Sequence, residues 1–565
     1  MSTKDIRRRR YLQLVGSGSV VGLAGCSGGS DPGGTSGDSG ATGGEGGSTT
    51  SDTEGEGGSG AGSMGGHLRV GQNRTVSTIS PIMMGSKFTE RWAVKLFYST
   101  LTRLDHQLQL YGDLATDWSA NESADVWTFT IRDDATFHHN GETVTASDVA
   151  ATFNTVYDSE VGSPGSGTMG DIGTVEAKDE TTVEFQLDGA NSDFPKLVAK
   201  GWGAVVPEEI ATDSSRRQEL GSKEFGSGPF ELESFEAGNQ VTGVAYDDYY
   251  GTDDEGTSRP YVDRVTARTI PEGSSLVNAL KNGDIDIIWE PPVDQWGPLQ
   301  EASGVTTGRV PAGNIVNFIM DVSVEPWSDE RVREAVKLAI DRQAIIEGVL
   351  SGLGEEAQDA PLSPSYEYFA EVEGRPPERD LEKARQLLAD AGYPDGFDLE
   401  DDFDITFFSA ADPPERLRSA VLIKDQLSEI GITFEIEQIS YDRYINDVWT
   451  KAPCYMGMYG MRISGANFMK LLLHSEGGWN GESHFSNEEF DEAITTAVQS
   501  TSSEETSQAM ATAQEVVAKQ GPYAIPYYDD QIGAMREYVQ RYNVSPLSYL
   551  FYADEIALGS GAPTR

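Results

Sequence analysis

The sequence predicts a mixed α/β fold with more than one domain. Asp125–Ile131 and Thr182–Leu187 alternate apolar and polar residues at period two, which is typical of half-buried strands. A helical spacing of apolar residues begins near Ser328, Asp380 and Pro414. Once the glycine-rich start of the chain is set aside, about 500 residues remain, which is too many for one hydrophobic core. We therefore expect strands and helices distributed over two or three domains.

The first 26 residues predict an export signal. Arg8 and Arg9 precede an aromatic residue and a leucine, as in a twin-arginine signal, whose cargo crosses the membrane folded. The apolar run then ends in Leu23–Cys26, which resembles a lipobox, where the cysteine becomes the lipidated first residue. A transmembrane anchor is the alternative, but Tyr11–Ala24 is shorter than the ~20 apolar residues that a spanning helix needs. We expect an exported protein, anchored to the outer face of the cell membrane by lipid on Cys26.

Residues 27–66 are expected to form a disordered tether. Glycine, serine, threonine and acidic residues make up almost all of this segment. Such a composition buries too little apolar surface to offset the loss of chain entropy. A flexible coil of about 40 residues reaches roughly 35 Å on average, which holds a folded body away from a membrane surface.

Two helices are expected in the middle of the body. The helix that opens at Ser328 places apolar residues at i, i+3, i+4, i+7 and i+8 from Val332. Asp380 is the expected N-cap of the next helix, which stops at Gly392 ahead of a proline. Both helices therefore present one apolar face to a core.

A third helix and a strand follow directly. The helix runs from about Pro414 to Ile430, ends at Gly431 and leads into the alternating stretch Ile432–Ile436. A helix, a glycine stop and then a strand are typical of a packed α/β layer.

Acidic residues dominate the charge of the chain. Asp and Glu number 91 against 42 Lys and Arg, which gives a net charge of −49, while hydrophobic residues still make up 38%. An acidic, lysine-poor surface on an ordered body is typical of adaptation to molar salt, as in haloarchaea, where a Debye length of ~3 Å screens the self-repulsion. An ordinary acidic exported protein is the alternative. We expect no binding of nucleic acid, because attraction to phosphates needs a basic face.

Motifs of the common enzyme classes are absent from the sequence. The chain has no nucleotide-binding P-loop, no Gly-x-Ser-x-Gly elbow and no His-Glu-x-x-His zinc helix. His138 and His139 are adjacent and point to opposite sides of a strand, a poor arrangement for one metal. Cys454 is expected to be a buried apolar residue, and it has no disulfide partner if Cys26 carries lipid. We expect no catalytic residue, no metal site, no cofactor and no enzymatic activity.

A set of ordered landmarks runs along the body from about residue 68 to about residue 545. They are Asp113–Trp118, Trp127–Val149, Val206–Pro207, Gly226–Phe230, Leu280–Asp286, Arg331–Arg342, Asp380–Tyr393 and Gln426–Ile432. In this order they resemble the family 5 solute-binding proteins, the oligopeptide, dipeptide and nickel receptors of ATP-binding-cassette (ABC) importers. Arg331–Arg342 is the most specific of them.

The resemblance implies a two-lobed periplasmic-binding-protein fold of type II, in the large peptide-receptor class, with an extra inserted subdomain. On this chain, lobe I would take residues 67–110, 205–312 and 525–565, the inserted subdomain residues 111–204, and lobe II residues 313–524. The crossings between the lobes would fall near Pro311–Asn314 and Tyr523–Pro526, with Gly313 as a torsional joint. For the first crossing, an ordinary turn is the alternative.

The resemblance also implies a function. Such receptors enclose a solute between their lobes and deliver it to a membrane permease, whose separate ATPase supplies the energy. The expected partners are a small-molecule or peptide ligand, the ABC permease with its ATPase, and the membrane through the lipid anchor, with the receptor as a monomer. An exported hydrolase and a sensor that presents its ligand to a signalling receptor remain alternatives.

A di- or oligopeptide is the first expectation for the ligand. In peptide receptors of this family, a loop of the second lobe carries an aspartate that pairs with the peptide's α-amino group. The matching segment here, Gly457–Phe468, has no acidic residue and offers Met461, Arg462 and Ser464 instead. A buried guanidinium favours a carboxylate or another anion. An oligosaccharide, a blocked or reversed peptide, and an anionic solute or metal chelate therefore stay open, as does a structural ion pair for Arg462.

Aromatic and polar side chains complete the candidate site. Trp289, Tyr459 and Trp479 lie at or near segments that are expected to border the cleft. Flat aromatic faces suit sugar rings or backbone amides, and Asn317 and Ser464 are the expected hydrogen-bonding neighbours. For each of the three aromatic residues, burial in a core is the alternative.

Overall fold

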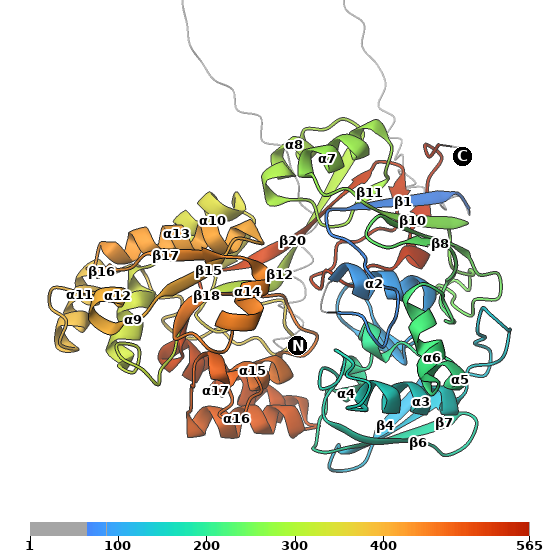
Figure 1. The fold of residues 1–565 in the computed structure, drawn as a ribbon, viewed down its shortest axis with the longest axis horizontal. Helices are drawn as coiled ribbons and strands as arrows, with labels where there is room; N and C mark the ends of the chain where they lie inside the picture. The colour runs from blue at the N-terminus through green and yellow to red at the C-terminus, as the bar shows by residue number, and fades with distance from the viewer. Residues whose placement is uncertain (1–64, 86–87, 564–565) are drawn as a thin grey trace, which may run out of the picture. The chain divides into compact units, whose positions relative to one another are not determined.

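Two long antiparallel strands, β12 (Val305–Met320) and β20 (Tyr527–Arg536), run through the middle of the protein (Figure 1). The structure is a computed structural model that describes residues 65–85 and 88–563. All of these residues belong to one unit, Ala61–Arg565.

Both strands belong to a twelve-stranded mixed sheet that extends into both lobes. From edge to edge its strands are β17 (Ile436–Ile439), β15 (Phe407–Ala410), β18 (Cys454–Tyr459), β12, β20, β11 (Ile287–Ile288), β1 (His67–Gln72), β10 (Arg264–Thr269), β9 (Gln240–Ala245) and β8 (Phe230–Glu236). Two short strands, β13 (Gly354–Glu356) and β19 (Tyr523–Ala524), pair with β20 and β12. Because β12 and β20 separate the strands of lobe II from those of lobe I, this pair joins the two halves of the sheet.

The segment that was expected to form the inserted subdomain has a four-stranded antiparallel sheet of its own. Its strands, in spatial order, are β4 (Ala115–Ala120), β5 (Val126–Ile131), β7 (Thr182–Leu187) and β6 (Ile172–Ala177), and α3 (Ala146–Tyr157) packs on them. Both strands predicted from period-two alternation are confirmed, because β5 and β7 each bury every second side chain. Phe129 and Phe185 are among the buried ones, with ring centres 5.4 Å apart. The alternation thus reflects a sheet with one face on a core.

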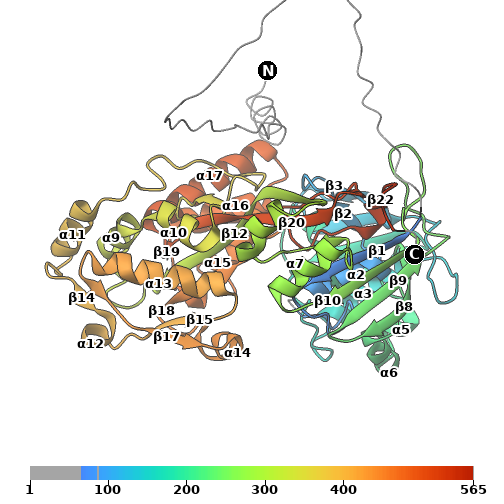
Figure 2. The same cartoon turned by 90° about the horizontal axis from the view of Figure 1, so that it is seen from above.

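Lobe II surrounds its part of the sheet with helices (Figures 1 and 2). They are α9 (Glu330–Ala339), α10 (Arg342–Leu350), α11 (Leu381–Asp390), α12 (Leu399–Phe403), α13 (Pro414–Ser428), α14 (Tyr441–Arg443), α15 (Gly465–Leu473), α16 (Glu488–Gln499) and α17 (Ser503–Gln520). The helix predicted from Ser328 begins two residues later, because the carboxylate of Asp329 accepts the N–H of Arg331 at 2.8 Å and caps α9. Asp380 caps α11 as predicted, and Gly392 follows the helix with a φ of +104°.

The strand predicted over residues 432–436 is wrong as a single element. Its first two residues form β16 (Ile432–Thr433), which pairs with β14 (Phe397–Asp398) outside the large sheet, and β17 begins only at Ile436. Between the two strands Phe434 packs against Phe407, with ring centres 4.6 Å apart. This packing draws the chain from one pairing partner to another.

The first expected crossing between the lobes lies inside β12. The pairing of β12 with β20 is continuous up to Pro311 and resumes at Ile315, with a register shift between them, so this segment is a strand and not a turn. A Cβ at Gly313 would lie 2.8 Å from the ring of Tyr366 and 3.0 Å from the Oγ of Ser363. The glycine is therefore required by close approach of neighbouring side chains.

The second expected crossing leads from β19 into β20. Tyr523 pairs with Ile319 of β12, and two residues later the N–H of Ile525 donates to the carboxylate of Asp359 at 2.9 Å. Asp359 is fully buried and also binds Arg342. A buried ion pair therefore fixes this segment of the backbone.

The remaining elements are short or peripheral to the sheet. They are α2 (Phe88–Phe97), α4 (Phe194–Leu197), α5 (Glu208–Ala211), α6 (Ser214–Arg217), α7 (Gly273–Asn282), α8 (Trp296–Gln300), β2 (Thr102–Leu104), β3 (Leu110–Gly112), β21 (Val539–Gln540) and β22 (Ala557–Leu558). Among residues 65–85 and 88–563, no helix combines the length and the apolar character needed to cross a membrane.

Candidate ligand-binding site

Three of the predicted site residues gather in lobe II, at the end of β18. The rings of Tyr459 and Trp479 are stacked, with centres 5.8 Å apart and planes inclined by 20°. The guanidinium carbon of Arg462 lies 5.8 Å from the ring of Trp479 and 5.6 Å from the ring of Phe468. The backbone N–H of Arg462 donates to the hydroxyl of Tyr366 at 2.9 Å. Aromatic faces thus hold the guanidinium without consuming its N–H donors.

A buried carboxyl group lies behind the stacked rings. Glu482 is fully buried and accepts hydrogen bonds from the hydroxyls of Tyr459, Tyr523 and Tyr455, the last at 3.3 Å. Burial raises the pKa of Glu482 to about 7, although the tyrosine hydroxyls oppose the shift by stabilising the charged form. Sequence reasoning did not single out this residue, because one acid among many carries no local signal.

Met461 and Ser464 lie where lobe II meets the inserted subdomain. The Ser464 hydroxyl donates to Asp193 at 2.6 Å and accepts the N–H of Asn467 at 3.1 Å, which makes it the N-cap of α15. The side-chain amide of Asn467 is paired with that of Asn191 at 3.1 Å. Met461 and Ser464 also line a cavity of about 120 Å³, whose lining further includes residues 107–109, Asp193 and Lys196. Residues from distant parts of the chain therefore enclose this space.

Trp289 and Asn317 lie apart from this group. Trp289 follows β11, is 4% exposed, and donates from Nε1 to the carbonyl of Ser548 at 2.7 Å in the core of lobe I. Asn317 is fully buried in β12 opposite Gly457, and neither its Oδ1 nor its Nδ2 has a hydrogen-bond partner among the described residues. The structure therefore gives Trp289 a packing partner and leaves the amide of Asn317 unsatisfied.

The charge of Arg462 acts on two cations that sequence reasoning missed, Arg91 and Lys200. Arg91 belongs to α2, and its guanidinium carbon is 4.5 Å from the ring of Trp202 and 5.4 Å from the ring of Tyr549. Burial, followed by repulsion from Arg462, lowers the pKa of Arg91 to about 9 and that of Lys200 to about 7. Cations from lobe I, the inserted subdomain and lobe II therefore act on one another.

Two buried lysines had a signal in the sequence: Lys200 and a further cation, Lys95. Each of them stands within an apolar run of a chain that is poor in lysine. Lys95 follows Arg91 by one helical turn, is 9% exposed and lies with its Nζ 5.3 Å from the ring centre of Tyr552. Its Nζ has no hydrogen-bond partner among the described residues.

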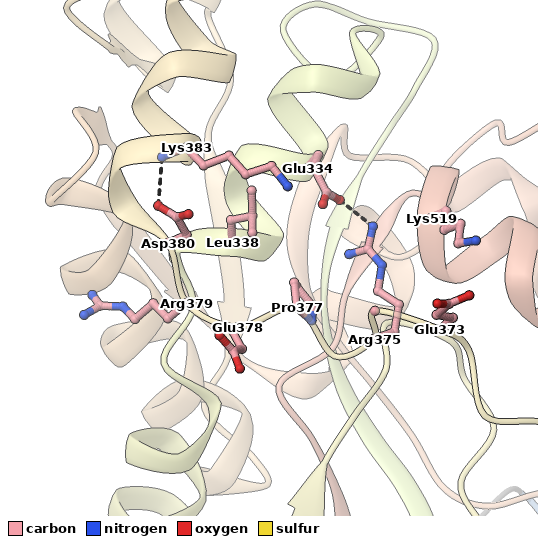
Figure 3. Close-up of a pocket in the computed structure, with 11 residues that line it drawn as sticks. Glu334, Leu338, Glu373, Arg375, Pro377, Glu378, Arg379, Asp380, Lys383 and Lys519 are labelled. Carbon is pink, nitrogen blue, oxygen red and sulfur yellow. Dashed lines mark hydrogen bonds and ion pairs between the residues drawn. The ribbon is translucent and has the colours of Figure 1, made fainter.

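A cavity of about 480 Å³ lies within lobe II, away from these residues (Figure 3). Its lining includes four acidic and four basic side chains, which are Glu334, Glu373, Glu378, Asp380, Arg375, Arg379, Lys383 and Lys519. Arg375 and Glu334 form an ion pair at 2.6 Å across it. Charges of both signs that neutralise one another, with none of the predicted site residues, make this surface a weak candidate for the ligand.

The residues predicted to direct export and lipidation cannot be placed in the structure. Arg8, Arg9 and Cys26 fall outside the ranges that the structure describes. Cys454 is buried as predicted. Within the described ranges, no group of three or more His, Cys, Asp or Glu side chains is arranged to hold a metal ion.

Comparison with known proteins identifies the family. Residues 109–480 match the model described as "Bacterial extracellular solute-binding proteins, family 5 Middle". The chain belongs to family 5 of the extracellular solute-binding proteins. Members of this family bind peptides or other small ligands and deliver them to an ABC permease.

The relatives of this family 5 protein are named after different ligands. It is 27% identical to Heme-binding protein A of Haemophilus influenzae over 66% of this chain and 68% of that protein. It is 26% identical to the oligopeptide-binding protein AppA of Bacillus subtilis over 81% and 85%. Among solved structures, the periplasmic binding protein DppA of Helicobacter pylori, in complex with the peptide STSA, matches with a TM-score of 0.74 at 21% identity, over 88% of this chain and 99% of that one. The two-lobed periplasmic-binding-protein fold predicted from the sequence is therefore confirmed.

Proposed function

We propose that this protein is the extracellular receptor of an ABC importer and closes its two lobes around one solute molecule, with a di- or oligopeptide as the first candidate. It is exported, held at the outer face of the membrane by lipid on Cys26, and hands its ligand to a permease. Membership in family 5 supports the receptor role, since the named relatives are solute-binding proteins and not enzymes.

One observation carries the proposal. Side chains from distant parts of the chain meet. Ser464 of lobe II donates to Asp193 at 2.6 Å, Asn467 pairs with Asn191, and Arg91 of α2 lies against Trp202 and Tyr549. A site assembled from both lobes binds its ligand best when the lobes are closed, so ligand binding favours closure. A receptor that releases its cargo to a permease needs this coupling between binding and shape.

Lobe closure is the first expected result. A pool of tripeptides with free termini, added to the full-length protein, binds with one peptide per chain and decreases the radius of gyration, as measured by calorimetry and small-angle X-ray scattering. Asn467→Ala removes the amide pair with Asn191 and weakens closure, whereas Asn446→Ala, which loses only a bond to the carbonyl of Asp442, serves as the matched control. Binding without any change in scattering, or conversion of the peptides to products, contradicts the receptor mechanism.

The lipid anchor gives a second expected result. Cys26→Ala leaves no thiol for the lipid, so the protein is released from the membrane into the medium or its precursor accumulates unprocessed. Cell fractionation and immunoblotting measure this, with Cys454→Ala as the control, because Cys454 is buried in lobe II. If the Cys26→Ala protein stays on the membrane at its mature size, the apolar run and not the cysteine is the anchor.

A further inference from the structure

We propose that residues 191–196 form a latch that stabilises the closed form of the protein without help from the ligand. The latch follows β7 of the four-stranded sheet and binds the helices α15 and α16 of lobe II. This inference rests on the lobe closure proposed above. It adds that groups of the protein itself, and not only the solute, favour the closed form and slow its opening.

The latch is anchored to the four-stranded sheet. The backbone N–H of Asn191 donates to the carbonyl of Ala124 at 2.9 Å, just before the start of β5. Three residues later, the ring of Phe194 packs into the core of that sheet, with its centre 5.2 Å from that of Phe185. The polar residues between these two anchors therefore keep a fixed position relative to the sheet.

Side-chain hydrogen bonds join the latch to the first turn of α15. The amides of Asn191 and Asn467 pair reciprocally, with N–O distances of 3.1 and 3.3 Å. Beside them, the hydroxyl of Ser464, which caps α15, donates to the carboxylate of Asp193 at 2.6 Å. Asn191 and Ser464 are both buried. Because hydrogen bonds are directional, this set forms only when the two segments meet in this register.

Two further contacts extend the latch. The N–H and the hydroxyl of Ser192 both donate to the carbonyl of Val498, near the end of α16, at 2.9 and 3.0 Å. Lys196 forms ion pairs with Asp193 of the latch and with Glu367 of lobe II, each at 2.9 Å. Figure 1 shows α4, which contains Lys196, facing α16 below β12 and β20. The latch thus lies away from the strands that join the lobes, where it opposes their separation.

The latch is polar, which makes it reversible. Every partner in these contacts is a group of the protein, so the contacts favour the closed form whether or not a ligand is bound. When the lobes separate, water bonds to each of these groups, so the net gain from each hydrogen bond is small. Polar contacts between domains permit relative motion, whereas large apolar contacts oppose it. The latch therefore slows opening without preventing it.

The latch also contributes to the wall of the cavity of about 120 Å³ described above. Asp193 and Lys196 line this cavity together with Met461 and Ser464. Separation of the latch from α15 removes part of the wall and exposes the space to solvent. The rate at which the latch separates is therefore expected to limit the release of a solute held there.

Asn467→Asp is the substitution that weakens the latch and spares the helix. Asn467 is the third residue of α15, where a carboxylate stabilises the helix by interacting with the positive end of its dipole. The same carboxylate cannot donate to Asn191, and it repels Asp193, to which it is linked through the hydroxyl of Ser464. Asn446→Asp adds the same charge at an exposed residue of lobe II and is the matched control.

The test measures distances across the latch without ligand. Spin labels are attached at Glu180→Cys, between β6 and β7, and at Glu489→Cys, on α16, since both residues are exposed. The full-length chain carries Cys26→Ala, which removes a competing thiol, while Cys454 is buried. Pulsed electron paramagnetic resonance is expected to show a short-distance population in the wild type. Asn467→Asp decreases the ratio of the short to the long population at least fivefold, and Asn446→Asp leaves it unchanged.

The rate of ligand release is a second readout. The tripeptide pool is expected to dissociate at least fivefold faster from Asn467→Asp than from the wild type, as surface plasmon resonance measures. The melting temperature of the ligand-free variant shows that it is folded. Lys196→Gln, which removes only the ion pairs at the edge of the latch, is the second variant, with an expected shift of about twofold in the same two readouts.

Two outcomes overturn the latch. One is the absence of a short-distance population in the ligand-free wild type. The other is an unchanged distribution of distances in both Asn467→Asp and Lys196→Gln. If no tripeptide binds, the peptide assignment in the proposed function falls, and the distances measured without ligand still decide whether the latch exists.

Discussion

Replacement of Asp359 by asparagine is expected to lower the free energy of unfolding by about 3–5 kcal/mol, the usual cost of breaking a buried ion pair from one side. Asp359 is fully buried; it accepts two hydrogen bonds from Nη2 of Arg342, at 2.8 and 2.9 Å, and lies 3.5 Å from Arg375. It also accepts the N–H of Ile525, in the segment that leads into β20. Asparagine keeps the shape and tolerates the positive φ of 62° at this position. The substitution therefore removes the charge and leaves the buried guanidinium of Arg342 uncompensated, while Arg375 keeps its ion pair with Glu334.

Denaturant unfolding, followed by circular dichroism in molar salt, measures this effect. Glu429→Gln is the matched control, because it breaks a solvent-exposed ion pair with Arg379 and such pairs contribute only about 0–1 kcal/mol. A difference between the two variants of less than about 1 kcal/mol would show that the buried pair does not hold the crossing segment.

Glu482 is expected to make the protein less stable as the pH rises from about 4.5 to about 7. Burial raises its pKa from 4.5 to about 7 in the folded state. Between these two values the folded protein holds a proton that the unfolded chain has released, so the free energy of unfolding falls with increasing pH in this window. At 1.36 kcal/mol per pKa unit the total is on the order of 3 kcal/mol. The loss is complete above about pH 7 and absent below about pH 4.5.

The contribution of Glu482 is isolated by comparison with Glu482→Gln, which cannot ionise. The unfolding free energies of the wild type and this variant are measured at pH 5 and pH 8, and the gap between them is expected to shift by about 2–3 kcal/mol in favour of the variant at the higher pH. Glu435→Gln, at an exposed residue, is expected to leave the pH dependence unchanged. Parallel pH profiles for the wild type and Glu482→Gln would mean that the tyrosine hydroxyls keep the carboxylate ionised.

Local patterns predicted those elements of the fold in which one face meets solvent. The alternation over β5 and β7 and the capping signal at Asp380 were sufficient, because each depends on neighbours in sequence. The course of β12 was not predicted in the same way. Pro311 and Gly313 in its middle resemble a turn, and residues 315–320 are buried on both faces, which removes the alternation.

Sequence reasoning found those residues of the candidate site whose type is unexpected for the segment in which they stand. Arg462 was singled out because it stands where a loop was expected to carry an acid, and the structure places it against Trp479 as part of an aromatic group. Arg91 was not found, since only the tertiary structure brings α2 against Trp202 and Tyr549. Trp289 was chosen because it lies at the end of a predicted strand, and Asn317 as an expected hydrogen-bonding neighbour of the aromatic residues. Neither criterion distinguishes a cleft from a core.

The place of β20 in the sheet has a consequence for how this protein is made. β20 lies between β12 and β11, so it is the strand through which the two halves of the sheet are joined, yet it begins only at Tyr527, long after both of its neighbours in the sequence. While the ribosome is still translating the segments before it, β12 and β11 each have an open edge that lacks its neighbour. The two lobes therefore complete their common sheet only after synthesis has reached Arg536, and a chain terminated before β20 lacks the strand that unites the two halves of the sheet.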